Sequence, residues 1–391
     1  MTEDDFIQIR NPMTLGVDRL PVHRTVLGVP GDEKPSVALM PDGELLLVGF
    51  KITRISDTPR QFQVDKTLFR SVDDGVTWSD GQVLDLPGVE PCLTVLKDGT
   101  LLVTVHVLAG DVCNSTGYSY SCLHRSTDRG NSWESIRIGP EDIPAAPQDS
   151  LVVTSRNVLE LADGTVIMGV SGIDGRDFLW RSTDSGRTWD KTAASTFTGI
   201  ERAKISFPRM GETLFWQNRS GDILGLFRVD AHDFDSIADP ETLDGYDPRL
   251  GDQHDLLMVF RSRDGGVTWE KGDELGSRYG EMYPSILRLH DGRLLLTFTV
   301  RHLRPPLGTH AVLGEETLDG CAFDYANDRL IIDRSTPMGD ISGGGFGPTV
   351  QLLDGTLLTA YSCRSGEPVV RVDSFLAAEQ HIEVARWRLP P

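Results

Sequence analysis

Paired hydrophobic segments separated by Asp-Gly recur along the chain. In each pair a short apolar run precedes the Asp-Gly and a second run follows it, which is the signature of a β-hairpin, because Asp and Gly both suit a tight turn. The turns are Asp42-Gly43, Asp98-Gly99, Asp163-Gly164, Asp291-Gly292 and Asp354-Gly355. A sixth pair, residues 213–217 and 223–227, has Ser220-Gly221 at this position. The pattern therefore predicts six hairpins.

A nine-residue pattern, R-S-x-D-x-G-x-[ST]-W, occurs four times in step with the hairpins. Its copies begin at Arg70, Arg125, Arg181 and Arg261. The Asp can accept hydrogen bonds from nearby backbone N–H groups and close a tight turn. The Gly permits positive φ, and the Trp offers a large apolar surface to bury. Repeats of a unit too small to bury its own core indicate an array.

Each repeat predicts four strands. The hairpin gives the first two, the third ends in the nine-residue turn, and a short fourth follows. The last repeat lacks a fourth strand, and an N-terminal strand at residues 22–29 is available to complete it. We therefore expect one all-β domain over residues 1–391. This domain would be a six-bladed β-propeller of four-stranded antiparallel blades, closed by the N-terminal strand.

Composition narrows the possible partners. The net charge of −20 opposes binding to nucleic acid and to anionic membrane surfaces. An anionic substrate would need a local group of Arg or Lys. The first residues, MTEDDF, show neither a basic nor an apolar leader, which favours a cytoplasmic protein. The five cysteines match no metal motif, and inert thiols are favoured over a Cys113–Cys122 pair. We expect neither a metal nor a cofactor.

The chemistry is expected at one mouth of the central channel, which the first strand of each blade would line. Eight positions before the hairpin turns stand Lys34, Glu90, Ser155, Glu212, Tyr283 and Phe346, and Glu33 precedes the first of these. The loops after the second strands should reach the same mouth. Their polar residues are Lys51, Arg54, Asp57, His106, Arg228, Arg301, His302, Arg304 and Arg364. Arginine binds carboxylates through paired hydrogen bonds, although a surface salt bridge is the commoner role of any single Arg.

The nine-residue pattern resembles the Asp-box of the sialidase superfamily, whose members are six-bladed propellers, and the resemblance spans nearly the whole chain. Glu212 and Arg228 are similar to two family residues that lie sixteen positions apart across the fourth hairpin. The resemblance implies that this Glu polarises a nucleophilic Tyr and that this Arg holds a substrate carboxylate. Arg304, ahead of Leu307-Gly308, resembles a second carboxylate-binding Arg. Asp57 falls where the family has its acid/base Asp.

Two positions depart from the family pattern. Glu33, or Lys34 beside it, stands where the first carboxylate-binding Arg is expected. Phe346 stands where the nucleophilic Tyr is expected, and its ring cannot attack carbon. Tyr283, with Glu281 nearby, would supply a tyrosine from the fifth blade instead.

A glycoside hydrolase acting on an acidic sugar is the favoured function, with a glycan or oligosaccharide as its partner. Such an enzyme needs a pair of carboxylates as acid and base or nucleophile. The candidates for this pair are Glu33, Asp57, Glu90 and Glu212.

Two other functions are compatible with the same residues. A polysaccharide lyase would use His106 or Tyr283 to remove a proton beside a uronate carboxylate. The cations that could neutralise that carboxylate are Arg228, Arg304 and Arg364. A non-catalytic propeller would bind a glycan on an aromatic face made by Tyr283 and Phe346.

Overall fold

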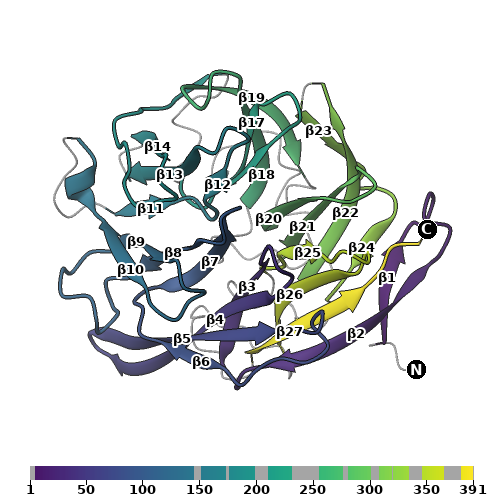
Figure 1. Ribbon diagram of the computed structural model, residues 1–391, viewed down its shortest axis with the longest axis horizontal. Helices are drawn as coiled ribbons and strands as arrows, with labels where there is room; N and C mark the ends of the chain where they lie inside the picture. The colour runs from purple at the N-terminus through teal and green to yellow at the C-terminus, as the bar shows by residue number, and fades with distance from the viewer. Residues whose placement is uncertain are drawn as a thin grey trace, which may run out of the picture.

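The regular elements of the computed structural model are β-strands (Figure 1). The structure describes residues 5–144, 151–172, 176–198, 210–230, 255–275, 281–300, 308–318, 320–333, 346–364 and 380–390. Within these ranges the helical residues are Asp5 and the 3-10 turn η2 (Pro140–Asp142). The described residues accordingly include no helix with the length and apolar character to cross a membrane. The all-β prediction is confirmed.

Antiparallel sheets stand around a common centre in Figure 1. The first predicted unit contains β3 (Asp32–Leu39), β4 (Leu45–Asp57), β5 (Arg60–Ser71) and β6 (Gln82–Leu84). The second contains β7 (Val89–Val95), β8 (Leu101–Val107), β9 (Tyr120–Ser126) and β10 (Glu134–Ile138). Both are four-stranded sheets with their strands in chain order, as the hairpin pattern predicts.

The third and fourth units depart from four regular strands. In the third, β11 (Val152–Thr154) and β12 (Leu159–Glu160) both pair with β13 (Val166–Gly172), so the first strand is interrupted. After β14 (Asp177–Ser182), isolated bridges at Asp190 and Ala194 replace the expected fourth strand. The fourth unit contains β16 (Leu214–Gln217), β17 (Ile223–Asp230), β18 (Asp255–Ser262) and β19 (Thr268–Leu275). A further strand, β15 (Thr196–Thr198), joins β19 in parallel.

The fifth and sixth units share one ten-stranded sheet. The fifth supplies β20 (Glu281–Arg288), β21 (Leu294–Val300), β22 (Gly308–Thr317), β23 (Gly320–Phe323) and β24 (Arg329–Ile331). The sixth supplies β25 (Thr349–Gln351), β26 (Leu357–Arg364) and β27 (Gln380–Trp387). The described strands therefore form a propeller-like arrangement of sheets rather than six separate four-stranded ones.

The N-terminal strands join these two units. β2 (Arg19–Leu27) pairs antiparallel with β27, from Val22 opposite Trp387 to Leu27 opposite Ile382, as the sequence predicts for the N-terminal strand. The sequence analysis missed β1 (Phe6–Arg10), which pairs with both β2 and β24. The hairpin of β1 and β2 thus bridges the outer edges of the last two units and fuses their sheets.

The nine-residue repeats form one recurring turn. In the first copy, the Asp73 carboxylate accepts hydrogen bonds from the Thr77 backbone N–H (2.9 Å) and the Thr77 hydroxyl (2.6 Å). The same two bonds recur in the other three copies. The turn glycine has positive φ in each copy, for example 75° at Gly75. The first residue of the pattern also links neighbouring units, because Arg70 donates to the Arg129 carbonyl and Arg125 to that of Ser185.

Apolar cores lie between neighbouring sheets. Leu45 and Leu47 of β4, for example, pack with Leu358 of β26 and Ile382 of β27, all of them buried. Because each sheet buries both faces against its neighbours, the inner strand of each unit is fixed around the centre.

Candidate active site

The predicted ring of channel residues has an unusual backbone. Five of its six members have left-handed φ: Lys34 (46°), Glu90 (56°), Glu212 (56°), Tyr283 (53°) and Phe346 (61°). Such φ values are uncommon for residues other than glycine and cluster at functional sites. In three inner strands the pairing register shifts at this point, which is the mark of a β-bulge. The bulges turn these side chains toward the centre of the molecule.

Charged side chains of opposite sign alternate across this centre. Lys34 is paired with Glu90, and Glu90 also meets Arg156, with 2.8 Å between Oε2 and Nη1. Arg156 then reaches Glu212, with 2.6 Å between Nη2 and Oε1. Glu212 also forms an ion pair with Arg228, with 2.9 Å between Oε2 and Nη1. We call these five residues the charge cluster.

The charge cluster is almost entirely removed from solvent. Relative exposure is 1% for Lys34, 6% for Arg156, 8% for Glu90 and 9% for Glu212. Three cations and two anions leave one formal positive charge at the centre of a chain whose net charge is −20. Buried charges of this kind persist only when each is paired.

The pKa values follow from this environment. Burial disfavours the Glu90 carboxylate, but the charges of Lys34 and Arg156 outweigh it and hold the pKa of Glu90 well below its usual range. Burial likewise opposes the Arg156 charge, yet Glu212 and Glu90 raise the pKa of Arg156. His106 has ligand atoms within 4.8 Å of both carboxylates, and its pKa is lowered by burial and by Arg156. At neutral pH the site therefore holds an ionised Glu90 beside a neutral imidazole.

An aromatic pair closes the centre on one side. The rings of Tyr283 and Phe346 are stacked, with centroids 3.8 Å apart and an angle of 27° between planes. The Arg156 guanidinium lies 4.9 Å from each ring centroid, and the Lys34 ammonium lies 5.1 Å from that of Phe346. The ring faces therefore help to compensate the buried cations.

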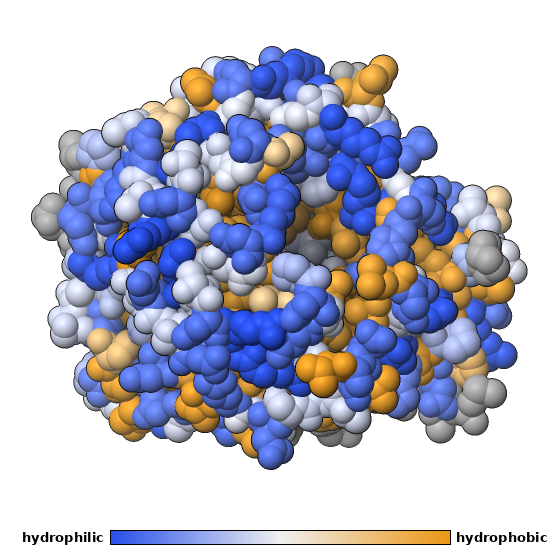
Figure 2. All heavy atoms as spheres, viewed as in Figure 1, coloured by the Kyte–Doolittle hydropathy of each residue, from blue (hydrophilic) through white to orange (hydrophobic). Residues whose placement is uncertain are grey.

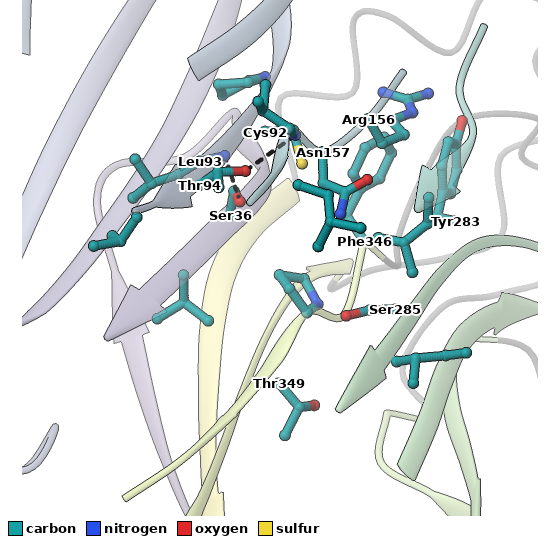
Figure 3. A pocket seen from close by; sticks show the side chains of 18 of the residues that line it. Ser36, Cys92, Leu93, Thr94, Arg156, Asn157, Tyr283, Ser285, Phe346 and Thr349 are labelled. Carbon is teal, nitrogen blue, oxygen red and sulfur yellow. Dashed lines mark hydrogen bonds between the residues drawn. The ribbon is translucent and has the colours of Figure 1, made fainter. Parts of the chain in front are cut away.

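A cavity of about 400 Å³ leads from this aromatic pair along the centre. It is lined by residues from the inner strands of all six units, β3, β7, β12, β16, β20 and β25. Arg156, Tyr283 and Phe346 lie together at one part of the lining, away from Ser285 and Thr349 (Figure 3). On the face seen in Figure 2 hydrophilic side chains predominate, and apolar ones show around the hollow near its centre. The volume falls within the ~300–1,000 Å³ that small-molecule sites occupy.

The structure brings together most of the residues that the sequence singled out. Of the ring, Lys34, Glu90, Glu212, Tyr283 and Phe346 meet as predicted, together with His106 and Arg228 from the second strands. Glu33 is also buried, one position before Lys34 on β3. Asp57 stands apart, because its exposed carboxylate at the end of β4 pairs with Arg54 at 2.7 Å.

Several candidates fall outside the described residues. Arg301 and Arg304 belong to residues 301–307, which the structure does not describe, and the same holds for the side chains of Glu281 and Arg364.

The sequence analysis missed Arg156, the residue that links the two carboxylates. It follows Ser155 at the position where three other units have Pro35, Pro91 and Pro284. A cation in place of proline on a channel-lining strand was the available signal.

The geometry defines a class: an all-β, propeller-like protein with a buried cluster of charged and aromatic residues beside a central cavity. No family model matches the chain. The chain is 29% identical over 169 residues to the xyloglucanase Xgh74A of Acetivibrio thermocellus, a match that covers 42% of this chain and 18% of that enzyme.

Solved structures share the fold over most of their length. A Dyadobacter fermentans protein of unknown function has a TM-score of 0.65 at 22% identity and covers 94% of this chain and 99% of its own. The NanB sialidase of Streptococcus pneumoniae has a TM-score of 0.60 at 13% identity, with 93% and 70% covered. The α-L-arabinofuranosidase Arb93A of Fusarium graminearum has a TM-score of 0.57 at 12% identity, with 98% of each chain covered.

Proposed function

We propose that this protein is a closed six-bladed β-propeller and a glycoside hydrolase that cleaves a glycosidic bond of an acidic sugar at the charge cluster. The observation that carries the proposal is the pair of carboxylates Glu90 and Glu212, which flank Arg156, and Arg156 in turn lines the cavity. The names of the similar proteins, a xyloglucanase, a sialidase and an arabinofuranosidase, support glycoside hydrolysis without fixing the sugar.

The separation of the carboxylates supports a retaining reaction. Ligand oxygens of Glu90 and Glu212 lie within 4.8 Å of one another. Carboxyl groups are ~5–5.5 Å apart in retaining glycosidases and ~6.5–9.5 Å apart in inverting ones, which need space for a water. The pKa of Glu90 lies well below its usual range, so its carboxylate stays ionised. This suits a nucleophile or a stabiliser of positive charge, and leaves Glu212 as the acid/base.

The surplus positive charge supports an anionic substrate. Arg156 and Arg228 can bind a sugar carboxylate in the bidentate manner typical of guanidinium groups. Lys34 adds a third cation, and the face of Tyr283 and Phe346 offers stacking for a sugar ring. The other residues that the sequence singled out remain candidates for further contacts in this proposal: Glu33, Asp57, Glu281, Arg301, Arg304 and Arg364.

Removing one carboxylate tests the assignment. Glu90→Gln and Glu212→Gln should each lower kcat/KM on acidic oligosaccharides by at least ~100-fold, the scale of an acid–base or nucleophilic group. The matched control is Glu160→Gln, because Glu160 lines the same cavity but pairs with Lys97 instead of the cluster. Circular dichroism of each variant establishes that it is folded. Full activity in folded Glu212→Gln would overturn the assignment.

A polysaccharide lyase is the second candidate, and His106 is the observation that favours it. Its pKa is lowered, so the imidazole is neutral and able to accept a proton. Arg156, which contributes to this lowering, could neutralise a uronate carboxylate and acidify the adjacent C–H. His106→Ala would then abolish formation of an unsaturated, ultraviolet-absorbing product.

A further inference from the structure

A second cluster of side chains with metal-ligand chemistry lies on the sheet of the sixth unit and shares no residue with the charge cluster. It consists of Cys363 on β26 and of His381 and Glu383 on β27. Cys363 and His381 are direct partners across the two strands, and Glu383 follows on the same face as His381. One ligand atom from each, a sulfur, a ring nitrogen and a carboxylate oxygen, lies within 4.8 Å of the other two.

A carboxylate from the neighbouring unit lies beside the thiol, outside the group of three whose ligand atoms all lie within 4.8 Å of one another. Asp333, buried just after β24, has its Oδ1 3.9 Å from the Cys363 Sγ. The His381 Nε2 is 3.6 Å from the Glu383 Oε1. Ligands 2.0–2.3 Å from a tetrahedral zinc ion lie ~3.3–3.8 Å from each other. The separation of His381 and Glu383 is therefore close to one edge of a zinc coordination tetrahedron.

The surrounding hydrogen bonds hold this geometry. The Tyr361 hydroxyl donates to the Glu383 Oε2, which leaves Oε1 directed toward His381. Arg24 donates to the Tyr361 oxygen and, over 2.7 Å, to the carbonyl of Ile332, the residue before Asp333. Partners of this kind orient the ligands in metal sites and are as much a part of them as the ligands.

We propose that Cys363, His381 and Glu383 bind one zinc-class divalent ion on the sheet of the sixth unit, with Asp333 beside the thiol. A thiolate, an imidazole and a carboxylate select zinc over calcium or magnesium, which take oxygen ligands. On binding, the Cys363 thiol releases its proton to solvent and the sulfur–metal bond forms. The site carries no catalytic role and is independent of the proposed function.

Among the described residues one other group has metal-ligand spacing, Glu90, His106 and Glu212. It is a poorer site, because Lys34 and Arg156 already neutralise its carboxylates and would repel a cation. At the cluster of Cys363, His381 and Glu383, the charge of Arg24 acts on Glu383, while its hydrogen bonds include those to Tyr361 and to the Ile332 carbonyl. The charge environment therefore separates two groups that spacing alone does not.

Cobalt is the probe for this site. The tag-free full chain, stripped of metal with chelator, is titrated with Co²⁺ while its absorbance is recorded. We expect saturation at one equivalent, with the visible bands of tetrahedral cobalt and a near-ultraviolet thiolate-to-cobalt band. Zn²⁺ should abolish both bands and raise the melting temperature, whereas Ca²⁺ should do neither. Absence of the thiolate band, or its loss on addition of Ca²⁺, would overturn the proposal.

Matched variants identify the ligands. Cys363→Ser should remove the thiolate band, while Cys113→Ser should keep it, because Cys113 is an exposed cysteine elsewhere in the chain. Tyr361→Phe should keep the band and weaken cobalt affinity ~10–100-fold, as expected for a residue that orients a ligand. If Cys363→Ser does not fold, His381→Gln serves in its place. It should weaken cobalt affinity at least as much as Tyr361→Phe does. A thiolate band that persists in Cys363→Ser, or unchanged affinity in His381→Gln, contradicts the site.

Discussion

Lys66 is a fully buried cation outside the charge cluster. Its ammonium donates hydrogen bonds to the carbonyl oxygens of Leu86 (2.8 Å) and Gly88, in the segment that leads to Glu90. Burial lowers the pKa of Lys66 to about 7, although Asp111 opposes the shift. His124 holds the same segment through the Pro87 carbonyl at 3.2 Å. Two buried basic groups thus fix the approach to the candidate site.

The stability of the protein should rise with pH because of Lys66. Between its folded pKa of about 7 and its unfolded value of 10.5, the unfolded chain binds a proton that the folded chain has released. Each pH unit in this window adds up to ~1.4 kcal/mol to the free energy of unfolding. The free energy of unfolding is measured in urea at neutral pH and two pH units higher. Over this interval the wild type should gain up to ~2 kcal/mol more than Lys66→Met does. The exposed Lys271, changed to Met, is the control. A difference that stays constant with pH would contradict this.

The register of the repeat predicted which residues lie together at the centre, whereas their roles stay predictions. Counting back from the hairpin turn identified Lys34, Glu90 and Glu212, because every inner strand enters the centre in the same way. This counting missed Arg156, because the first strand of the third unit is interrupted. The Arg156 side chain also extends from the third unit to Glu90 of the second and Glu212 of the fourth. Asp57 was expected at the mouth from its place after a second strand and from the resemblance, but it pairs with Arg54, three residues before it. Side-chain pairing across units is not encoded in any single strand.

At the scale of elements, the repeated turn is a self-contained structural device. In the fourth copy, Asp264 accepts hydrogen bonds from the Thr268 N–H (2.9 Å) and hydroxyl (2.6 Å) and from the Ser262 hydroxyl (2.8 Å). Trp269, which is fully buried, follows and donates to the Gly266 carbonyl at 3.1 Å. Partial burial opposes the charge, but these hydrogen bonds lower the pKa of Asp264 to about 2. The sequence predicted this turn because all of its contacts are local.

Asp264→Ala should destabilise the protein by about 1–2 kcal/mol, the usual effect of losing a side-chain cap on backbone N–H groups. The effect should diminish as pH falls from 3.8 toward 2, because protonation then removes the same carboxylate from the wild type. Glu270→Ala, which removes an exposed ion pair with Arg263, is the control and should change stability by less than ~0.5 kcal/mol. Equal effects of the two substitutions in urea unfolding would refute the structural role.

At the scale of the whole molecule, the two ends of the chain meet in one sheet. β2 pairs along β27, and β1 continues to β24, so residues near the N-terminus bind two units near the C-terminus. The Asp328 carboxylate adds to this by accepting hydrogen bonds from the backbone N–H groups of Met13 (2.7 Å) and Thr14 (2.8 Å). The missing fourth strand of the last repeat predicted β2, but β1 is a short strand with no hairpin turn to mark it.

Deletion of residues 1–27 should expose the edge of β27, which loses its hydrogen-bonded neighbour. Unpaired sheet edges promote association between chains. We expect the truncated protein to elute as large aggregates in size-exclusion chromatography, whereas deletion of residues 1–4 alone should leave the elution volume of the full chain unchanged. A truncated protein that matches the full chain in elution and melting temperature would show that β2 is dispensable.

The reaction itself is tested most directly by the mass of the product formed in ¹⁸O-labelled water. An acidic oligosaccharide is incubated with the protein, and each product is weighed by mass spectrometry. Hydrolysis at Glu90 and Glu212 predicts that one labelled oxygen enters the new reducing end and that folded Glu212→Gln forms no product. Unlabelled, unsaturated products would identify a lyase, and cleavage that persists in Glu212→Gln would contradict the assignment of the site.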